Sequence, residues 1–433
     1  MDWQSYYAQR CVTAEEAAAK IASGQRILYG HAVAQPTALS DALVRNKDAY
    51  RDVGIIHMVC MGNGDYCKPE MAQNFRHIAM FLGARTKDVI AEGRGDFVPA
   101  HLSLVPEMLR SGLLPVDVFA CQVSVPDKHG YVSLGCSVDY NRQAVDTAPV
   151  VIAQVNANMP HTMGDTFVHV SEIDWFIDQT EPLIELPRAQ ISETEIALGR
   201  NIAALIDDGA TLQMGIGSLP DAVLMFLKDK NDLGIHSEMI SDGTMELMKA
   251  GNITGKRKTL FPKKALITFF MGSREFYEFT DYNPAIHMLP ADIVNDVSVI
   301  GRNDNMVAIN SCVQVDLQGQ IASESVGPVQ ISGTGGQVDF IRGARRSRGG
   351  KSIIAISSTA KNGTVSKIVP LLDEGSVVTT LRTDADYIVT EFGAAALRGK
   401  TLRDRAKALI EVAHPDFRPE LIREYERRYS SKY

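Results

Sequence analysis

The chain has 433 residues, of which 45% are hydrophobic and 22% are charged, and 44 Lys and Arg against 52 Asp and Glu give a net charge of −8. This length exceeds one ordinary hydrophobic core and predicts two to three soluble globular domains. The acidic balance argues against nucleic acid as a partner, and the longest apolar runs are too short to span a bilayer, so we expect no membrane partner either.

The six cysteines are scattered without a C-x-x-C pair, and the ten histidines show no spacing typical of metal ligands. We therefore expect reduced thiols and no metal site. The first residues, Met-Asp-Trp-Gln-Ser, contain neither a basic stretch nor an apolar one, so no signal peptide is expected and the predicted location is cytoplasmic.

The first half of the chain begins with a helical stretch, a strand framed by Gly24 and Gly30, the loop 31–36 and a second helical stretch. The second half repeats this order with Gly209, Gly215 and the loop 216–220, which leads into a helix that we place from Pro220 onward. Further apolar runs predict buried strands over 54–60, 116–121, 150–155, 265–271, 352–357 and 386–390. The sequence thus predicts an internally duplicated α/β protein with two similar open α/β domains and largely parallel sheets.

The boundary between the two domains is expected where Pro182 and Pro187 interrupt the pattern. A helix follows, because Ser192 and Glu195 form a capping-box signature. We therefore expect an N-terminal domain over 1–185 and a C-terminal domain over 186–433.

One carboxylate, Glu238, lies between Gly234 and Gly243, and glycines allow sharp bends or close approach to a ligand. A lone glutamate most often only faces water. A carboxylate is nevertheless ionised at neutral pH and needs no general base before it attacks a thioester carbonyl. The segment therefore also fits a nucleophile.

Four blocks of sequence carry a family resemblance. They are Gly-Ile-Gly-Ser-Leu-Pro at 215–220, the segment around Glu238, Gly-Thr-Gly-Gly-Gln-Val-Asp-Phe at 333–340, and 389–399 with Glu391 and Gly393. Together, and in this order, they resemble the acetyl-CoA hydrolase/transferase family of CoA-transferases over nearly the whole chain.

The resemblance implies CoA exchange between short-chain acids, with 4-hydroxybutyrate, butyrate and acetate the expected set. The exchange would follow ping-pong kinetics through a glutamyl-CoA thioester at Glu238. Coenzyme A and acyl-CoA would be substrates, no cofactor would be tightly bound, and a homodimer is possible. The resemblance also places an active site with Glu238 on the second domain and part of the acid-binding wall on the first.

Oxyanion donors are expected from two places. By resemblance, Asn310 contributes to the oxyanion site, although the residue alone is more typical of a turn or strand end where it bonds its own backbone. The second place is the glycine run, whose backbone amides are candidate oxyanion donors and coenzyme contacts; its residues are Gly333, Gly335 and Gly336.

The coenzyme is assigned by the resemblance to the first glycine loop, which comprises Gly215, Ile216, Gly217, Ser218 and Leu219. Such a loop also suits a dinucleotide, but Pro220 replaces the third glycine of that fingerprint. A second candidate segment contains Ser358 and Lys361, where the lysine fits either a CoA phosphate or a solvated loop. The arginines at 342, 345, 346 and 348 are a second choice for the 3′-phosphoadenosine end.

Candidate contacts for the acid substrate are His31, Gln35 and Asn63 in the first half and Glu391 in the second. The segment 156–164 is a further part of the expected wall. Ordinary turn chemistry is the alternative for the asparagines.

Three other functions compete with CoA transfer. A hydrolase of the same family differs only in whether water reaches the thioester, which sequence separates poorly. The broken glycine fingerprint argues against a nicotinamide oxidoreductase. A non-catalytic CoA-binding regulator would leave Glu238 without a task.

Overall fold

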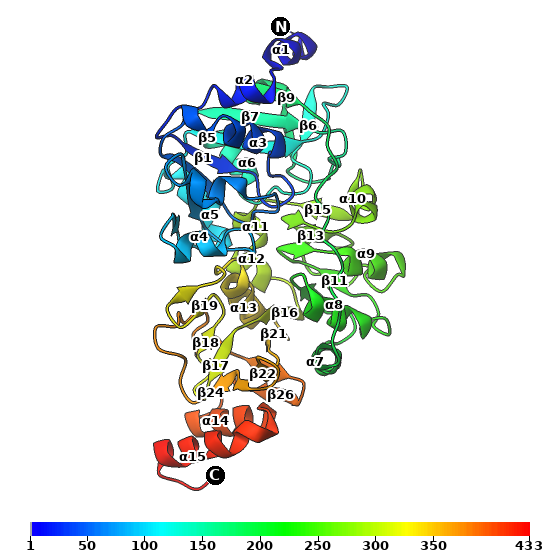
Figure 1. The fold of residues 1–433 in the computed structure, drawn as a ribbon. Helices are drawn as coiled ribbons and strands as arrows, with labels where there is room; N and C mark the ends of the chain where they lie inside the picture. Colours follow the sequence, from blue (N-terminus) through cyan, green and yellow to red (C-terminus); the bar gives the residue numbers. More distant parts are fainter. Residues whose placement is uncertain (1) are drawn as a thin grey trace. The chain divides into compact units, whose positions relative to one another are not determined.

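The computed structural model describes residues 2–433 and forms two compact units (Figure 1). Unit 1 contains the chain up to Pro187 together with Leu266–Val294, and unit 2 contains Arg188–Ala265 and Asn295–Tyr433. The chain first passes from unit 1 to unit 2 after Pro187, close to the boundary expected at 185/186. The expected division did not include the return of Leu266–Val294 to the first unit.

Unit 1 is built on a seven-stranded sheet with the order β4-β3-β2-β1-β5-β7-β9, in which every pair is parallel. The strands are β1 (Arg26–Tyr29), β2 (Val53–His57), β3 (Phe75–Ala79), β4 (Gly95–Phe97), β5 (Val118–Val123), β7 (Val150–Val155) and β9 (Trp175–Asp178). Strands β1, β2 and β5 are almost entirely buried, as expected for a parallel sheet covered on both faces.

Short helices connect these strands. They are α1 (Trp3–Arg10), α2 (Ala14–Ala18), α3 (Thr37–Arg45), α4 (Lys87–Ala91), α5 (Val105–Arg110) and α6 (Asn141–Thr147). The unit also holds β6 (Tyr131–Ser133), β8 (Phe167–His169), β14 (Phe269–Phe270), α10 (Arg274–Thr280), β15 (Ile286–Met288) and α11 (Ala291–Val294). A core of Ile27, Leu39, Ile55 and Val118 joins α2 and α3 to the sheet.

Unit 2 is built on a six-stranded sheet with the order β11-β10-β16-β21-β25-β26, in which only the edge strand β26 is antiparallel. The strands are β10 (Thr211–Gln213), β11 (Gly234–Ile235), β16 (Met306–Ser311), β21 (Lys351–Ala355), β25 (Tyr387–Thr390) and β26 (Gly393–Ala396). The run 265–271, which we expected in this second sheet, forms β13 (Ala265–Ile267) and β14 outside it. A short buried apolar run identifies a strand but not the sheet that the strand joins.

The helices of unit 2 are α7 (Glu193–Ala203), α8 (Ser218–Met225), α9 (Asp242–Lys249), α12 (Val297–Gly301), α13 (Gln337–Arg346), α14 (Leu402–Val412) and α15 (Arg418–Tyr429). The capping box at the start of α7 is confirmed, with Ser192 and Glu195 bonded reciprocally. Helix α8 begins at Ser218, so Pro220 is its third residue and not its first. Smaller strands complete the unit: β12 (Met239–Ile240), β17 (Gln314–Asp316), β18 (Ile321–Ala322), β19 (Ser325–Val326), β20 (Val329–Gln330), β22 (Thr359–Ala360), β23 (Val365–Ser366) and β24 (Ile368–Val369).

The two sheets share one topological plan, which confirms the predicted duplication. In unit 1 the chain runs from β1 to β2 on one side, and β5 joins on the other side of β1. In unit 2 it runs from β10 to β11, and β16 joins on the other side of β10. Ligands of open α/β sheets bind at the carboxyl ends of strands beside such a switch point. By this rule, the loops that follow β1 and β10 are the expected ligand-binding loops.

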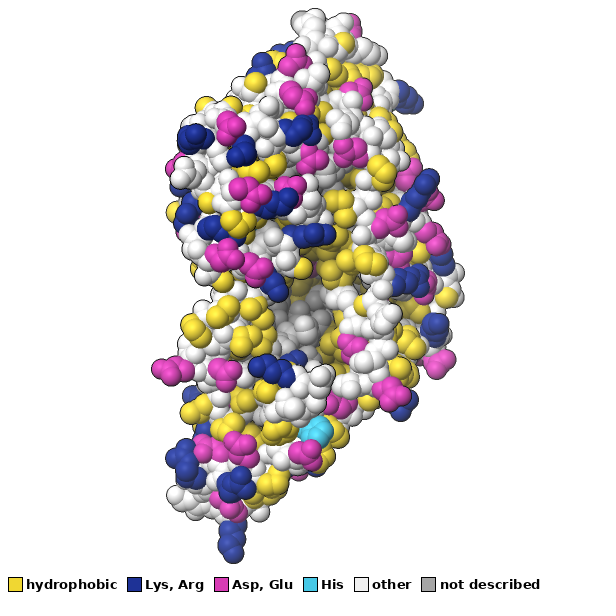
Figure 2. Space-filling model, in the orientation of Figure 1, with side chains coloured by type: hydrophobic (Ala, Val, Ile, Leu, Met, Phe, Trp, Pro, Cys, Tyr) yellow, Lys and Arg dark blue, Asp and Glu magenta, His cyan; other side chains and the backbone are white. Residues whose placement is uncertain are grey.

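Charged side chains of both signs are interspersed on the face drawn in Figure 2, without a broad patch of a single sign. Among residues 2–433, no helix is both long enough and apolar enough to cross a membrane.

Two histidines on neighbouring strands of unit 1 make its stability sensitive to acid. Burial lowers the pKa of His77 to about 4, and burial together with nearby histidines holds the pKa of His57 well below its usual range. The unfolded chain takes up these protons near pH 6.5, so stability is fully present above that pH and falls as the pH drops toward 4.

We predict that His77 alone removes about 2 kcal/mol of unfolding free energy between pH 7 and pH 5. Urea unfolding at both pH values measures this loss. His77→Leu should lose correspondingly less between the two values, and equal losses in variant and wild type would contradict the assignment.

Candidate functional site

The predicted residues of unit 2 gather at one edge of its sheet. Parallel strands send all their carboxyl ends to the same edge. The glycine loop follows β10, Glu238 follows β11, Asn310 lies near the end of β16, Ser358 follows β21 and Glu391 follows β25. Five segments that are distant in sequence therefore share the carboxyl edge.

Glu238 is half-buried and has a partner that sequence analysis did not identify. The Nδ2 atom of Asn295 donates a hydrogen bond to Oε2 of Glu238 at 2.9 Å, and Asn295 is fully buried. Its sequence context, Asn-Asp before a short helix, looks like ordinary turn chemistry, and Asp296 does cap α12. No sequence signal therefore marked Asn295 as a site residue.

Gly336 completes the surroundings of this carboxylate. A Cβ atom added to Gly336 would lie 1.9 Å from Oε2 of Glu238 and 2.3 Å from Nδ2 of Asn295, so only glycine fits there. Gly336 is also the N-cap of α13, whose positive end favours negative charge nearby. A carboxylate, an amide donor and a helix N-terminus therefore meet at one point.

The strand and turn that carry Glu238 are fixed residue by residue. The carbonyl oxygen of Ile235 accepts a bond from Nζ of Lys258 at 2.6 Å, and Nδ1 of His236 lies 2.8 Å from the amide nitrogen of Asn303. The hydroxyl of Ser237 bonds both backbone groups of Met214.

The flanking glycines serve packing and not sharp turns. A Cβ at Gly234 would lie 2.3 Å from Cγ of Lys258, and a Cβ at Gly243, inside α9, would lie 2.6 Å from Cδ1 of Leu224. Neither glycine has a positive φ. Both glycines therefore allow close packing, whereas the sequence had also suggested a sharp bend.

Asn310 forms a reciprocal amide pair with Gln213 of the neighbouring strand. Its Nδ2 donates to Oε1 of Gln213 at 3.0 Å, and Nε2 of Gln213 donates back to Oδ1 at 3.2 Å. The contact with Glu238 comes from Asn295 instead. The oxyanion role of Asn310 stays a prediction.

The first glycine loop is open at two positions. No atom lies within 4 Å of a Cβ added to Gly215 or to Gly217, and Gly217 has a φ of 106°. Ser218 begins α8, and its hydroxyl bonds the carboxylate of Glu195. The coenzyme assignment of this loop stays a prediction.

A cavity of about 650 Å³ lies at the same edge of the sheet, within the size range of small-molecule sites. Its lining includes Leu219 of the glycine loop, Ser357, Lys361 and Lys367. Lys367 donates to Oγ of Ser357 at 3.2 Å, and Lys361 is exposed. Two cations therefore line a cavity that sequence analysis had marked only through Lys361 and the glycine loop.

Glu391 holds the neighbouring loop in place. Its carboxylate accepts bonds from the backbone nitrogen of Ser358 at 2.9 Å and from the Ser358 hydroxyl at 2.6 Å. These contacts give Glu391 a structural task beside the substrate role that the sequence predicted.

The arginine cluster lies elsewhere. Arg342 and Arg345 bond the carboxylate of Asp384, and Arg348 bonds Asp304. The cluster occupies the second half of α13 and the turn just after it, where the chain leads into the start of β21 and thus to the amino edge of the sheet. This edge is opposite to the one that carries Glu238.

The candidates in unit 1 also lie near the end of a central strand. His31, directly beyond β1, is buried, bonds the buried carboxylate of Asp139 and packs against Phe269 with ring centroids 4.3 Å apart. Gln35 is buried and accepts from the backbone nitrogen of Gly62 at 3.0 Å. Asn63 is exposed and accepts from the backbone nitrogen of Asp65, as in an ordinary Asx turn.

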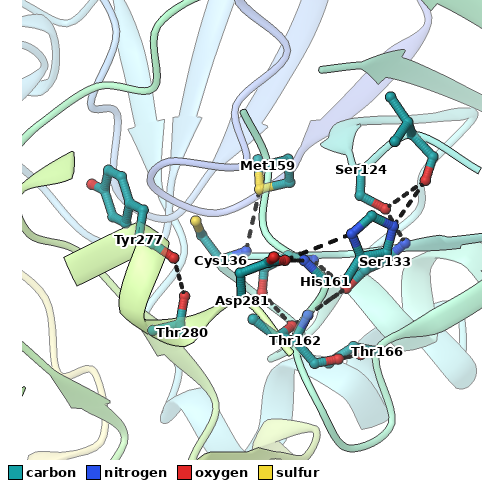
Figure 3. Close-up of polar contacts among 12 residues, drawn as sticks. Ser124, Ser133, Cys136, Met159, His161, Thr162, Thr166, Tyr277, Thr280 and Asp281 are labelled. Atoms are coloured by element: carbon teal, nitrogen blue, oxygen red, sulfur yellow. Dashed lines mark hydrogen bonds and ion pairs between the residues drawn. The ribbon is translucent and has the colours of Figure 1, made fainter. Parts of the chain in front are cut away.

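Unit 1 has a cavity of its own, of about 530 Å³, beside α10. Figure 3 shows one wall, where His161 lies beside Asp281; its backbone nitrogen donates to Oδ1 of Asp281 at 2.7 Å. The His161 ring also stacks on Tyr282 with centroids 4.8 Å apart. Among residues 2–433, no group of three or more His, Cys, Asp or Glu side chains is arranged to hold a metal ion.

The sequence of this duplicated α/β protein matches two known domain families. Residues 1–186 match the acetyl-CoA hydrolase/transferase N-terminal domain, and residues 272–425 match the acetyl-CoA hydrolase/transferase C-terminal domain. The chain belongs to the acetyl-CoA hydrolase/transferase family. Glu238 lies between the two matched ranges.

Individual relatives cover the whole chain. The chain is 54% identical to 4-hydroxybutyrate coenzyme A transferase of Clostridium kluyveri, over 99% of this chain and 100% of that protein. It is 36% identical to butyryl-CoA:acetate CoA-transferase of Anaerostipes caccae, over 99% and 98% of the two chains. The crystal structure of RipA from Yersinia pestis superposes with a TM-score of 0.95 at 39% identity and covers 99% of this chain and 100% of its own.

We predict that the two open glycines respond differently to substitution. Gly215 has no positive φ and open space around it, so Gly215→Val should weaken acyl-CoA binding at least tenfold if the coenzyme passes there, with little change in melting temperature. Gly217→Val should lower the melting temperature as well, because its positive φ strains any β-branched residue.

Acyl-CoA titration and thermal melting on the same two proteins measure these effects. A stable Gly215→Val variant with unchanged coenzyme affinity would remove this loop from the coenzyme site.

Proposed function

We propose that this chain is an acyl-CoA:carboxylate CoA-transferase that moves CoA between short-chain acids, with 4-hydroxybutyrate, butyrate and acetate the expected set. Glu238 is the proposed nucleophile. The observation that carries the proposal is the half-buried carboxylate of Glu238, held 2.9 Å from the Asn295 amide at the N-terminus of α13. The named activities of the relatives support the reaction class.

In the first half-reaction, one oxygen of Glu238 attacks the acyl-CoA carbonyl, the C–S bond breaks, and a mixed anhydride and CoA thiolate form. The thiolate then attacks the glutamyl carbonyl of the anhydride. The free acid leaves with the bridging oxygen, and a glutamyl-CoA thioester remains. A second acid runs the same steps in reverse, which gives ping-pong kinetics.

Asn295 suits the step at the glutamyl carbonyl. When Oε1 of Glu238 forms the anhydride, Oε2 is the oxygen on which negative charge develops as the thiolate attacks. The Asn295 amide already points at that atom from 2.9 Å, within the distance range of an oxyanion donor. The positive end of α13 adds to this stabilisation.

The substrate carbonyl needs its own donors. The proposal assigns them to Asn310 and to amides of the run Gly333, Gly335 and Gly336. The coenzyme would extend from this point along the loop 215–219 toward the cavity with Lys361 and Lys367, where phosphate and ammonium groups attract each other. His31 and Gln35 are proposed contacts of the acid substrate.

A hydrolase remains the second candidate, since acetyl-CoA hydrolase of Neurospora crassa is 27% identical over 80% of this chain. The higher identity to named transferases favours transfer over hydrolysis. The proposal includes a homodimer, a cytoplasmic location and no tightly bound cofactor. A panel of acids with acetyl-CoA, followed by the mass of acyl-CoA products, identifies the acid pair and separates transfer from hydrolysis.

The proposal predicts a covalent CoA adduct on Glu238. Protein incubated with butyryl-CoA and no acceptor acid should gain the mass of a CoA thioester, and acetate should remove it. Peptide mapping should place the adduct on Glu238. An adduct on another residue, or no adduct under trapping conditions, would refute the proposed mechanism.

Glu238→Gln should abolish transfer and leave the fold and CoA binding intact, because the exchange removes only the nucleophilic oxygen. Glu246→Gln is the matched control, since Glu246 pairs with Arg188 on the surface of the same unit. Retained turnover in a Glu238→Gln preparation free of deamidated protein would exclude Glu238 as nucleophile.

Asn295→Ala and Asn310→Ala should each lower kcat and kcat/KM together by about a hundredfold, the scale of a lost oxyanion donor. Steady-state kinetics for both substrates measures this. A change confined to KM would move the affected asparagine from the oxyanion site to substrate binding.

A further inference from the structure

Lys258, in the stretch between α9 and β13, is a buried lysine that the proposed reaction does not use. The residue is 5% exposed. Its Nζ atom donates to the carbonyl oxygen of Ile235 at 2.6 Å and to that of Lys264 at 2.7 Å. The side chain thus joins β11, the strand that leads to Glu238, to the segment that enters β13.

The aliphatic part of Lys258 makes a second contact with the same strand. It lies so close to Gly234 that any side chain there would collide with it, at 2.3 Å from Cγ. Gly234 and Ile235 form all of β11. Lys258 therefore supports both residues of this strand, one by packing and one by a hydrogen bond.

Burial of the Lys258 amine costs desolvation free energy that a side chain with only a packing role would not require. Burial alone lowers the pKa of Lys258 to about 7. The nearby charged side chains of its own segment, Lys256 and Arg257, contact Asp232 and the carbonyl of Asp208. A methionine would occupy similar volume without this desolvation cost. The polar end is therefore best explained by the two carbonyls that it holds.

We propose that Lys258 is a positioning residue for the nucleophile: its amine fixes the Ile235 carbonyl and thereby the placement of Glu238, three residues further along. The inference rests on the proposed function of Glu238. From Ile235 onward every residue up to Glu238 has a fixed partner, namely Lys258, Asn303, Met214 and Asn295 in turn. Lys258 secures the first of these contacts.

Loss of the amine should act on the chemical step more than on substrate binding. A displacement of about 1 Å at a reacting group can lower a rate a hundredfold. The coenzyme cavity contains neither Lys258 nor the carbonyls that it bonds. Lys258→Met should therefore lower kcat by about tenfold or more, because the nucleophile is misplaced. It should leave KM for acyl-CoA within about threefold of the wild-type value.

Lys351→Met is the matched control. Lys351 is a half-buried lysine that donates to the backbone carbonyl of Leu205 at 2.7 Å and to the carboxylate of Asp207 at 2.9 Å. It is the first residue of β21 and thus lies at the opposite edge of the sheet. The kcat of Lys351→Met should stay near the wild-type value. Lys258→Arg keeps N–H donors on a long chain and should recover at least part of the activity that Lys258→Met loses.

The decisive measurement is the single-turnover rate of CoA adduct formation on folded proteins, with hydrogen exchange of residues 234–239 as an independent readout. The inference predicts a slower rate and faster exchange in Lys258→Met, and neither in Lys351→Met. If Lys258→Met does not fold, Lys258→Gln, whose shorter amide cannot span both carbonyls, is measured instead.

A folded Lys258 variant that forms the adduct at the wild-type rate would overturn the inference, as would an arginine variant no faster than the methionine one. Absence of an adduct on Glu238 in the wild-type protein would instead refute the proposed function itself. The two failures are therefore distinguishable.

Discussion

The direction of the strands is the constraint on which the rest of unit 2 depends. Because β10, β11, β16, β21 and β25 run parallel, the loops that follow them must meet at one edge of the sheet. That edge collects Glu238, Asn310, the loop 215–219 and Glu391 from segments spread over more than 150 residues of sequence. No single motif could build such a site; the topology does so.

The site itself is organised by fixed polar contacts. Asn295 bonds the Glu238 carboxylate, Gly336 allows the close approach, and Glu391 holds Ser358 at the neighbouring strand end. Groups held in place before the reaction need little rearrangement as charge develops, which is the main source of electrostatic catalysis. The contacts that hold Glu238 in place are therefore as important to the proposed reaction as the carboxylate itself.

Much of this could be predicted from the sequence, and the rest could not for identifiable reasons. Glycine spacing and apolar runs predicted the duplicated α/β plan, and the capping box at Ser192 predicted the start of α7, because these are local signals. The return of Leu266–Val294 to unit 1 was missed, because a short apolar run carries no information about its partner sheet. Asn295 was missed because its neighbours look like a turn. The sequence singled out Gly243 as a residue that allows a sharp bend or close approach to a ligand. Its actual role is close packing against Leu224, which only the structure could show.

In the proposed mechanism an oxygen of Glu238 passes into the product acid, and transfer of an oxygen isotope measures this passage. Each turnover should release one oxygen of Glu238 into the departing acid and replace it with one from the incoming acid. After many turnovers with acyl-CoA and 18O-labelled acetate, the peptide containing Glu238 should carry 18O, and protein given labelled acetate without acyl-CoA should not. Active enzyme that turns over under these conditions and leaves Glu238 unlabelled would show that Glu238 is not the nucleophile.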